Sequence, residues 1–307
     1  MDRLDSMRIF VAVAEAGGFA PAARRLALSP PAVTRAVAAV EERIGARLLH
    51  RTTRIVRLTE AGTRFLEDCR RILAEIEEAE AAAAGLHAEP RGPVGVTAPV
   101  LFGRLHVAPV LFEVAGRYPG LVVRSFFIDR IVHLAEEGYD VAVRIAELPD
   151  SGLSAVRVGS VRRVVCASPA YLAAHGAPRS PAELAEHETI PFFQGSTPRE
   201  WTFHHGGGRT GAVSRTETIT PRARLIVNHA DVAVAAAVAG RGVTRVMSYQ
   251  AAAAIRAGEL VVLMEEFEPP PIPIHVVHQE GRRASARVRA LVDFLAEGLR
   301  ADPALRG

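Results

Sequence analysis

The stretch FAPAARRLALSPPAVTRAVAAVEE, residues 19–42, decides the fold of the N-terminal part of this chain. Its small and apolar residues predict two short helices joined by a tight turn at Ala27-Leu28. Ser29 is a good N-cap, and Pro30 suits the first helical position, where the missing N–H costs nothing. The second helix then carries one apolar stripe, formed by Val33, Val37, Val40 and Ile44. The stretch therefore predicts a helix-turn-helix.

The other face of this second helix is small and partly polar. Small residues let a helix backbone approach DNA closely, while threonine and arginine side chains reach base edges or phosphates. An ordinary helical hairpin with a polar face is the alternative interpretation, and the residues that follow favour DNA binding. The predicted contacts lie at the start of the helix: Ser29, Pro30, Pro31, Thr34 and Arg35.

Residues 43–62, RIGARLLHRTTRIVRLTEAG, predict a basic β-hairpin. Leu48-Leu49 and residues 55–58 read as two short strands around a turn at residues 50–54. The segment 43–57 holds five arginines and no acidic residue, whereas a solvated basic loop usually intersperses acids. A basic hairpin after a recognition helix is typical of a wing that contacts phosphates or the minor groove. The predicted wing contacts are Arg51, Thr52 and Arg54.

The charge of the chain is concentrated at this end. All 37 basic residues are arginines, and the net charge is +3. Residues 1–60 hold ten arginines and six acidic residues, a net charge of +4, so the remainder carries −1. This asymmetry indicates a polyanionic partner for the N-terminal part only.

The 307 residues suffice for about two domains. The two cysteines, Cys69 and Cys166, are too few and too far apart for a disulfide framework and fit a reducing compartment. Arginine and aspartate interrupt each apolar run near the N-terminus, so no signal peptide is expected. No run approaches the roughly 18 apolar residues of a membrane span. These features predict a cytoplasmic protein with no membrane partner.

Two further helices complete the N-terminal part. The first carries the stripe Leu4, Met7, Phe10, Val11 and Ala14 and ends at Gly17-Gly18. The second, over residues 63–84, shows a heptad seam that predicts a dimerising linker helix, with packing onto the next domain as the alternative. Glycine and proline at residues 85–93 then end it. The seam residues are Phe65, Cys69, Ile72, Ile76, Ala79 and Ala83.

Residues 4–62 resemble the DNA-binding domain of LysR-type transcriptional regulators. The resemblance rests on AEAGGF, on AARRLALSPPAVTRAVAAVEERIGARLLHRTTR and on VRLTEAG. The family commonly has a polar residue where Pro30 stands and often leucine at Val40. A polar base contact from position 30 is therefore absent, and more weight falls on Pro31, Thr34 and Arg35. The resemblance implies that a homodimer, or a tetramer of two dimers, binds an operator in double-stranded DNA.

The remaining residues alternate strand-like and helical runs, the signature of an α/β domain. They resemble the effector-binding domain of the same family, two α/β subdomains joined by two crossovers as in periplasmic binding proteins. The crossovers are expected near Cys166–Ser168 and Arg245–Met247. Predicted strands span 94–97, 121–127, 141–145, 161–167, 224–227, 242–247, 260–263 and 274–278, and predicted helices span 100–117, 131–137, 170–175, 229–239, 249–257 and 285–300.

The fold class that follows is an N-terminal winged helix-turn-helix, mostly α, with a linker helix, then a two-subdomain α/β effector domain. The predicted boundaries are 1–60 for the winged helix-turn-helix, 61–88 for the linker and 89–307 for the effector domain. Subdomain I would comprise about 91–165 and 247–301, and subdomain II about 166–246.

Ligands of open α/β sheets bind beyond the carboxyl ends of strands, where helix N-termini offer free N–H groups. One such point is the turn Thr97-Ala98-Pro99-Val100, which links the first strand to its helix. Asn228 is expected to cap the helix at 229–239 and to face the same cleft as this turn. Arg144 interrupts the apolar run DVAVRIAEL and needs a partner, either a carboxylate such as Asp129 or Asp140 or an anionic ligand. The predicted effector contacts are Thr97, Ala98, Pro99, Val100, Phe127, Asp129, Arg144 and Asn228.

No sequence pattern supports catalysis or a cofactor. The 11 histidines lack a metal-binding spacing, and no nucleophile elbow or phosphate-binding loop occurs. The prediction is a LysR-type regulator whose effector is a small organic acid or an aromatic compound. The alternatives are a constitutive DNA-binding regulator, an enzyme on the two-lobed scaffold, and a periplasmic solute-binding protein, against which the missing signal peptide speaks.

Overall fold

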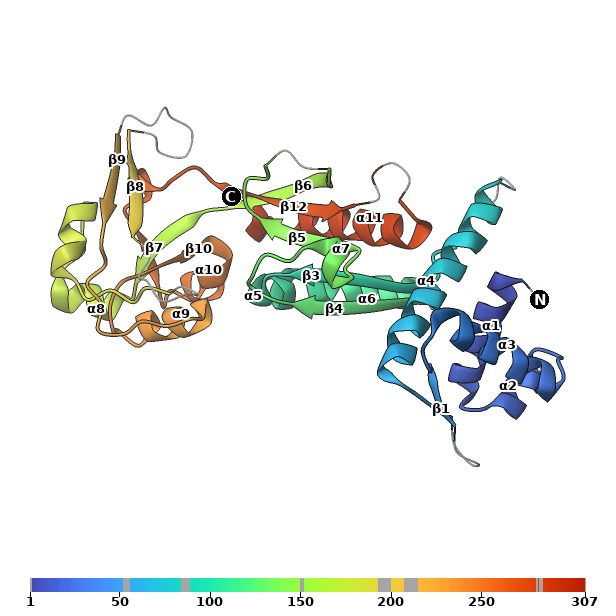
Figure 1. Ribbon diagram of the computed structural model, residues 1–307. Coiled ribbons are helices and arrows are strands. Elements are labelled where there is room, and N and C mark those ends of the chain that lie inside the picture. The colour runs from blue at the N-terminus through green and yellow to red at the C-terminus, as the bar shows by residue number, and fades with distance from the viewer. Residues whose placement is uncertain are drawn as a thin grey trace. The chain divides into compact units, whose positions relative to one another are not determined.

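The computed structural model describes residues 2–51, 56–83, 89–149, 152–192, 200–206, 215–279, 281 and 284–306 (Figure 1). The chain forms two compact units. The first comprises Met1–Val94 with Tyr118–Val123 and Ser285–Ala290, and the second comprises Gly95–Arg117, Arg124–Ala284 and Leu291–Gly307.

The first unit contains the helix-turn-helix and its wing. Its described elements are α1 (Arg3–Ala16), α2 (Phe19–Arg25), α3 (Pro30–Ile44), β1 (Leu49–Arg51), β2 (Val56–Leu58) and α4 (Glu60–Ala83). Phe10, Val13, Val33 and Val37 are fully buried and form the centre of its core. The helices predicted for this part and the presence of two wing strands are confirmed. His50 and Arg51, which were predicted to lie in the turn, belong to β1, and Ile55 lies outside the described residues.

Local sequence explains where α3 begins and ends. Ala27 adopts a left-handed φ of 54° in the turn, and the Ser29 hydroxyl accepts the N–H of Ala32, so Ser29 is the predicted N-cap. Gly45 ends the helix with a φ of 73°, a conformation that costs glycine little. Ile44, which stands at this end, is 43% exposed and does not extend the buried stripe as predicted. Ala36 is buried in the stripe instead.

The first turns of α4 pack inside the same unit. Cys69 is fully buried in the core cluster, and the ring of Phe65 lies 5.3 Å from that of Phe10 on α1. The predicted dimer seam is therefore wrong for Cys69, which the winged domain itself covers, whereas Phe65 packs against this core and is only partly buried. Ile72, Ile76 and Ala79 further along α4 are at least partly exposed.

The second unit consists of two lobes. The larger lobe is built on a five-stranded sheet in the order β4-β3-β5-β12-β6. Strand β3 is parallel to β5, and β12 is antiparallel to both β5 and β6. The bounds are β3 Gly92–Ala98, β4 Leu121–Phe127, β5 Val141–Ile145, β6 Ser154–Val161 and β12 Ile272–His278.

Helices beside this sheet close its core (Figure 1). A continuous helical segment runs through α5 (Val100–Phe102), a π-helical turn (Gly103–Val107) and α6 (Ala108–Arg117). It packs against α11 (Ala286–Ala301) so closely that a Cβ at Gly298 would lie 2.7 Å from Val110. The remaining helices of the larger lobe are α7 (Leu134–Glu137) and a 3-10 turn (Pro303–Leu305).

The smaller lobe is built on the three-stranded sheet β10-β7-β11, in which the central β7 is antiparallel to both neighbours. Helices α9 and α10 pack on this sheet, and the β8–β9 hairpin extends from the lobe (Figure 1). The bounds are β7 Arg163–Ala167, α8 Pro169–His175, Pro181–Glu186 (3-10), β8 Trp201–His205, β9 Arg215–Ile219, α9 Ala230–Val238, β10 Thr244–Met247, α10 Ser248–Arg256, β11 Val261–Leu263 and Glu265–Phe267 (3-10).

Both predicted crossovers are displaced in the structure. The predicted strand 161–167 is two strands, and the chain changes lobe at Arg162 rather than at 166–168. Strand β10, helix α10 and strand β11 all belong to the smaller lobe, so the chain returns after Leu263 rather than at 245–247. Apolar runs continue across both points, and their pattern does not reveal which sheet a strand joins. The predicted strand 224–227 forms only isolated bridges.

Candidate functional site

The N-terminus of α3 presents the predicted DNA contacts. Ser29, Pro30, Pro31 and Arg35 are exposed, and Thr34 is half-buried. The Thr34 hydroxyl donates to the Pro30 carbonyl at 2.9 Å, and Arg35 Nε donates to the Pro31 carbonyl at 3.4 Å. Both side chains are thereby held along the helix. The hydroxyl oxygen of Thr34 and the Nη groups of Arg35 keep their remaining hydrogen-bonding capacity for a ligand.

The wing is fixed to α3 through a carboxylate. Glu41 Oε1 accepts the backbone N–H groups of Leu48 at 2.9 Å and Leu49 at 3.1 Å. Thr59 then donates its N–H to the Leu48 carbonyl at 2.9 Å. These contacts place the hairpin at the end of the recognition helix.

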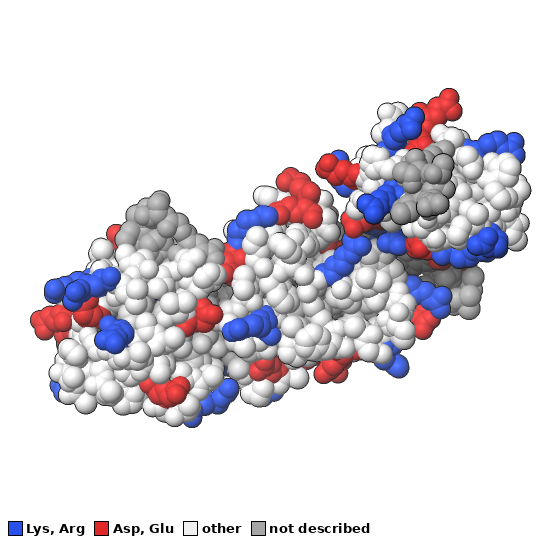
Figure 2. All heavy atoms as spheres, turned by 90° about the horizontal axis from the view of Figure 1, so that it is seen from below, with Lys and Arg blue, Asp and Glu red and all other residues white. Residues whose placement is uncertain are grey.

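The two wing strands pair antiparallel, with His50 opposite Arg57 and Arg51 opposite Val56. The backbone of Arg51 therefore lies in the wing, whereas its side chain, Thr52 and Arg54 lie outside what the structure describes. On the face drawn in Figure 2, basic side chains stand singly among neutral and acidic ones.

A pocket of about 500 Å³ opens between the two lobes of the second unit. From the larger lobe it is lined by Pro99, Val100, Leu101, Arg104, Asp129 and Ile145. The smaller lobe contributes the ends of β7 and β10 and the start of α9. This volume lies in the range typical of small-molecule sites.

Four of the predicted effector contacts line this pocket: Pro99, Val100, Asp129 and Asn228. Asp129 Oδ1 accepts the N–H of Val100 at 2.8 Å, so a carboxylate of the chain itself occupies the helix N-terminus expected to hold an anion. The prediction that Asn228 is the N-cap of α9 is wrong. His229 holds that position, and its side chain makes no capping hydrogen bond.

The other four predicted contacts do not line the pocket. Strand β3 continues to Ala98, so Thr97 and Ala98 are 2% and 3% exposed inside the sheet. The ring of Phe127 lies against Gly103, where a Cβ would meet it at 2.4 Å. Close packing in the sheet thus explains why Thr97 and Ala98 are covered, and Phe127, which is partly exposed, packs on Gly103.

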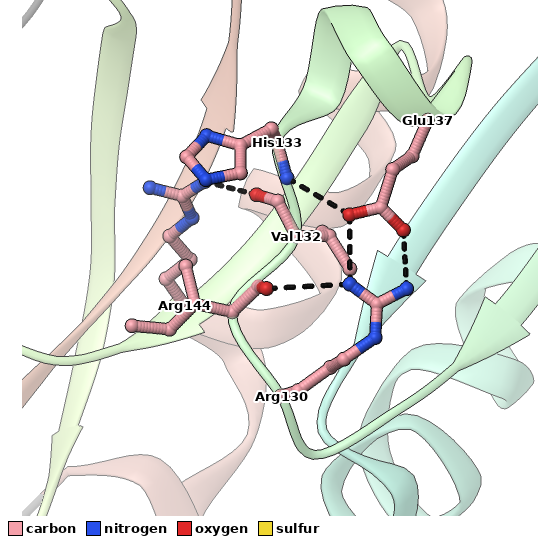
Figure 3. Close-up of polar contacts among 6 residues, drawn as sticks. Arg130, Val132, His133, Glu137 and Arg144 are labelled. Atoms are coloured by element: carbon pink, nitrogen blue, oxygen red, sulfur yellow. Dashed lines mark hydrogen bonds and ion pairs between the residues drawn. The ribbon is translucent and has the colours of Figure 1, made fainter.

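Arg144 is held elsewhere by a main-chain carbonyl. Its Nη2 donates to the Val132 carbonyl at 3.0 Å, beside the ion pair of Arg130 and Glu137 (Figure 3). The predicted ion pair of Arg144 with Asp129 or Asp140 is absent from the described chain; Asp140 accepts the N–H of Gly95 at 2.6 Å.

Three arginines of the pocket were not predicted from the sequence: Arg104, Arg163 and Arg245. Arg245 on β10 is 8% exposed, its Nη2 donates to the Thr202 carbonyl at 2.6 Å, and its guanidinium lies 4.7 Å from the centre of the Phe203 ring. Burial, followed by repulsion from Arg163, lowers the pKa of Arg245 to about 9. An arginine in the apolar run GVTRVM, residues 242–247, was the signal that could have identified it.

Aromatic side chains form much of the remaining wall: Phe192, Trp201 and Tyr249. Tyr249 is 5% exposed, and Gln250 donates to its hydroxyl at 3.2 Å. Burial raises the pKa of Tyr249 to about 12, so this side chain is neutral near pH 7. The pocket therefore offers flat apolar surfaces together with three arginines and three acidic side chains, Asp129, Glu200 and Asp231.

Within the described ranges, no cluster of three or more histidine, cysteine, aspartate or glutamate residues is arranged to hold a metal ion. No helix of the described chain combines the length and apolar character needed to cross a membrane.

Comparisons with known proteins match both parts of the chain to one family. Residues 4–63 match the bacterial regulatory helix-turn-helix protein model of the lysR family, and residues 87–300 match the LysR substrate binding domain. An HTH-type transcriptional repressor of Pseudomonas aeruginosa is 32% identical over 308 residues, covering 100% of this chain and 95% of the relative. An HTH-type transcriptional regulator of Xanthomonas campestris is 35% identical, covering 97% and 86%.

The structure of CrgA, a LysR-type transcriptional regulator from Neisseria meningitidis, matches with a TM-score of 0.59 and 30% identity, covering 96% of this chain and 98% of that one. The full-length Vibrio cholerae virulence activator AphB shares the fold, with a TM-score of 0.60 and 24% identity over 96% and 99% of the two chains. These relatives are regulators rather than enzymes. The chain thus belongs to the LysR family of transcriptional regulators.

Proposed function

We propose that this protein binds a specific operator in double-stranded DNA and that a small molecule in the pocket between its lobes controls this binding. A single observation supports the proposal. The same chain has an exposed face at the start of α3, the expected recognition helix, and a pocket of about 500 Å³ between its lobes. Residues 1–60 would bind DNA, 61–88 would link and 89–307 would bind the effector. The protein would act in the cytoplasm, where its DNA lies.

DNA contact falls to the start of α3 and to the wing. Thr34 and Arg35 would read base edges or phosphates, with Ser29, Pro30 and Pro31 allowing close approach of the backbone. Arg51, Thr52 and Arg54 would contact the backbone or the minor groove.

A dimer would present two recognition helices to two half-sites of an operator. The exposed part of α4, at Ile72, Ile76 and Ala79, is the surface that we assign to pairing between two copies. Two such dimers would form a tetramer.

The effector would be a small organic acid or an aromatic compound. It can alter DNA binding only if it prefers one arrangement of the lobes over another. Because the pocket is lined from both lobes, a ligand that contacts both satisfies this requirement.

The test is a fluorescence anisotropy titration of the full chain with DNA from upstream of its own gene, repeated with a panel of small acids and aromatic compounds. We expect at least one compound to change the operator affinity and also to raise the melting temperature of the protein, by mass action. Specific binding that no compound alters, together with no change in melting temperature, would favour the constitutive regulator instead.

A further inference from the structure

The Arg245 guanidinium has an unusual set of partners for a buried charge. Buried arginines are normally paired with a carboxylate, because an uncompensated buried charge is costly. Arg245 is instead held by a neutral carbonyl, that of Thr202, and by the ring of Phe203. No carboxylate of the described chain lies within 4 Å of it, and its Nε has no hydrogen-bond partner there.

A second arginine stands on the same sheet face. In the antiparallel ladder, Met247 on β10 pairs with Arg163 on β7, which places Arg163 diagonally from Arg245. Both line the pocket, and their charges repel each other. The nearby carboxylate of Glu268 attracts Arg245 more weakly than Arg163 repels it, and it is hydrogen-bonded to Arg162 at 3.2 Å. An anion bound in the pocket would relieve this repulsion.

The start of α9 faces the same space. His229, Ala230 and Asp231 line the pocket. The N-cap residue His229 makes no side-chain cap, and the Asp231 carboxylate accepts the N–H of Val232 at 2.9 Å. The positive end of the helix adds to the attraction for an anion. The Nε of Arg245, which has no hydrogen-bond partner in the described chain, and the start of α9 are independent observations on one pocket.

The rest of the lining limits the charge and shape of the ligand. Asp129, Glu200 and Asp231 equal the three arginines in number, so the lining has no formal excess of positive charge to hold a doubly charged phosphate. Phe192, Trp201 and Tyr249 offer flat surfaces suited to an aromatic ring. We propose that the pocket binds an aromatic monocarboxylate whose carboxylate is held by Arg245, with Arg163 nearby. This deepens the proposed function and rests on it.

The test compares benzoate, phenylacetate, cinnamate and 1-naphthoate with their uncharged primary amides, using thermal shift and calorimetry on the full chain. We expect at least one carboxylate to raise the melting temperature with concentration, while its amide does not. Arg245→Met should lower the affinity of the protein for that carboxylate about 10-fold to 100-fold, the range expected for the loss of a charge-assisted hydrogen bond. Arg256→Met, an exposed arginine of the same lobe outside the pocket, should leave the affinity unchanged.

Arg245→Lys gives a second measurement, because it keeps the charge but loses the planar fork of donors. Its affinity should lie between those of the wild type and Arg245→Met. The proposal is overturned if no carboxylate binds, if amide and carboxylate bind equally, if inorganic phosphate binds as well as the carboxylate, or if Arg245→Met binds within twofold of the wild type. A neutral compound that binds and alters operator affinity would overturn only this ligand class and leave the proposed function standing.

Discussion

Gly62 at the start of α4 faces the main chain of Leu48 so closely that a Cβ at position 62 would lie 1.9 Å from the Leu48 carbonyl oxygen. This contact holds the linker helix against Leu48, the residue directly before the first wing strand β1. The Thr59 hydroxyl completes the junction by accepting the Gly62 N–H at 2.9 Å and donating to the Arg47 carbonyl at 2.8 Å. The position of the wing beside α3 therefore depends on a residue without a side chain.

Gly62→Ala should destabilise the winged domain. The added methyl group meets backbone, which cannot rotate away, and overpacking of this kind costs about 1–3 kcal/mol. Chemical unfolding of the full chain measures the loss. Gly116→Ala on α6 is the matched control, because no atom lies within 4 Å of its Cβ position and alanine is favoured in helices. Equal stability of the two variants would contradict the close contact.

Arg35→Ala should weaken specific operator binding by roughly 1–3 kcal/mol if the guanidinium reads a base edge. Anisotropy at fixed salt with the cognate duplex and a shuffled duplex separates this from a phosphate contact, which weakens binding to both alike. Arg117→Ala, an exposed arginine on α6, serves as the charge-matched control. An affinity unchanged by Arg35→Ala would remove this side chain from the readout.

Both cysteines should resist thiol reagents in the folded protein. Cys69 and Cys166 are fully buried, and burial raises the pKa of each thiol to about 12, with the charge of Asp68 adding to the effect at Cys69. The thiolate is the reactive form, so little reaction is expected at pH 8. A chromogenic disulfide reagent should detect two thiols only after denaturation. Rapid reaction of the native protein would show that one of the thiols is accessible.

Glu15 should give the winged domain a small pH-dependent stabilisation. Burial alone would raise its pKa, but hydrogen bonds from Arg70 and Arg25, at 3.0 and 2.9 Å, outweigh this and lower the pKa below the ordinary 4.5. The stabilisation is therefore complete above about pH 4.5 and is lost as the pH falls through the lowered pKa.

Glu15→Gln should thus be less stable than the wild type near pH 7, by under about 1 kcal/mol because the group is partly exposed. The difference should shrink below pH 4.5. Unfolding curves at pH 7 and at lower pH measure it, with the exposed Glu113→Gln as control. A difference that stays constant with pH would mean that the carboxylate charge is not its source.

Local chemistry explains which parts of the structure the sequence predicted. The Ser29 cap, the Pro30 start and the turn at Ala27 are determined by neighbouring residues, so α3 and its exposed face were predictable. Pro99, Val100 and Asp129 follow strand ends of a regular α/β unit, and their place in the pocket was also predicted.

The rest of the pocket depends on tertiary arrangement. Arg163 and Arg245 meet only because β7 and β10 pair antiparallel after the crossover at Arg162, which the apolar pattern did not locate. Arg144 and Arg245 each interrupt an apolar run in the same way. The folded structure distinguishes them. Arg144 donates to the Val132 carbonyl and does not line the pocket, whereas Arg245 does.

The central claim is sequence-specific DNA binding through the start of α3. A footprinting experiment with the full chain on DNA upstream of its own gene tests it most directly, with wild type and Arg35→Ala side by side. We predict a discrete protected site that survives competition by shuffled DNA and is weakened in the variant. Protection spread evenly along the fragment, or none at low salt with folded protein, would contradict the claim.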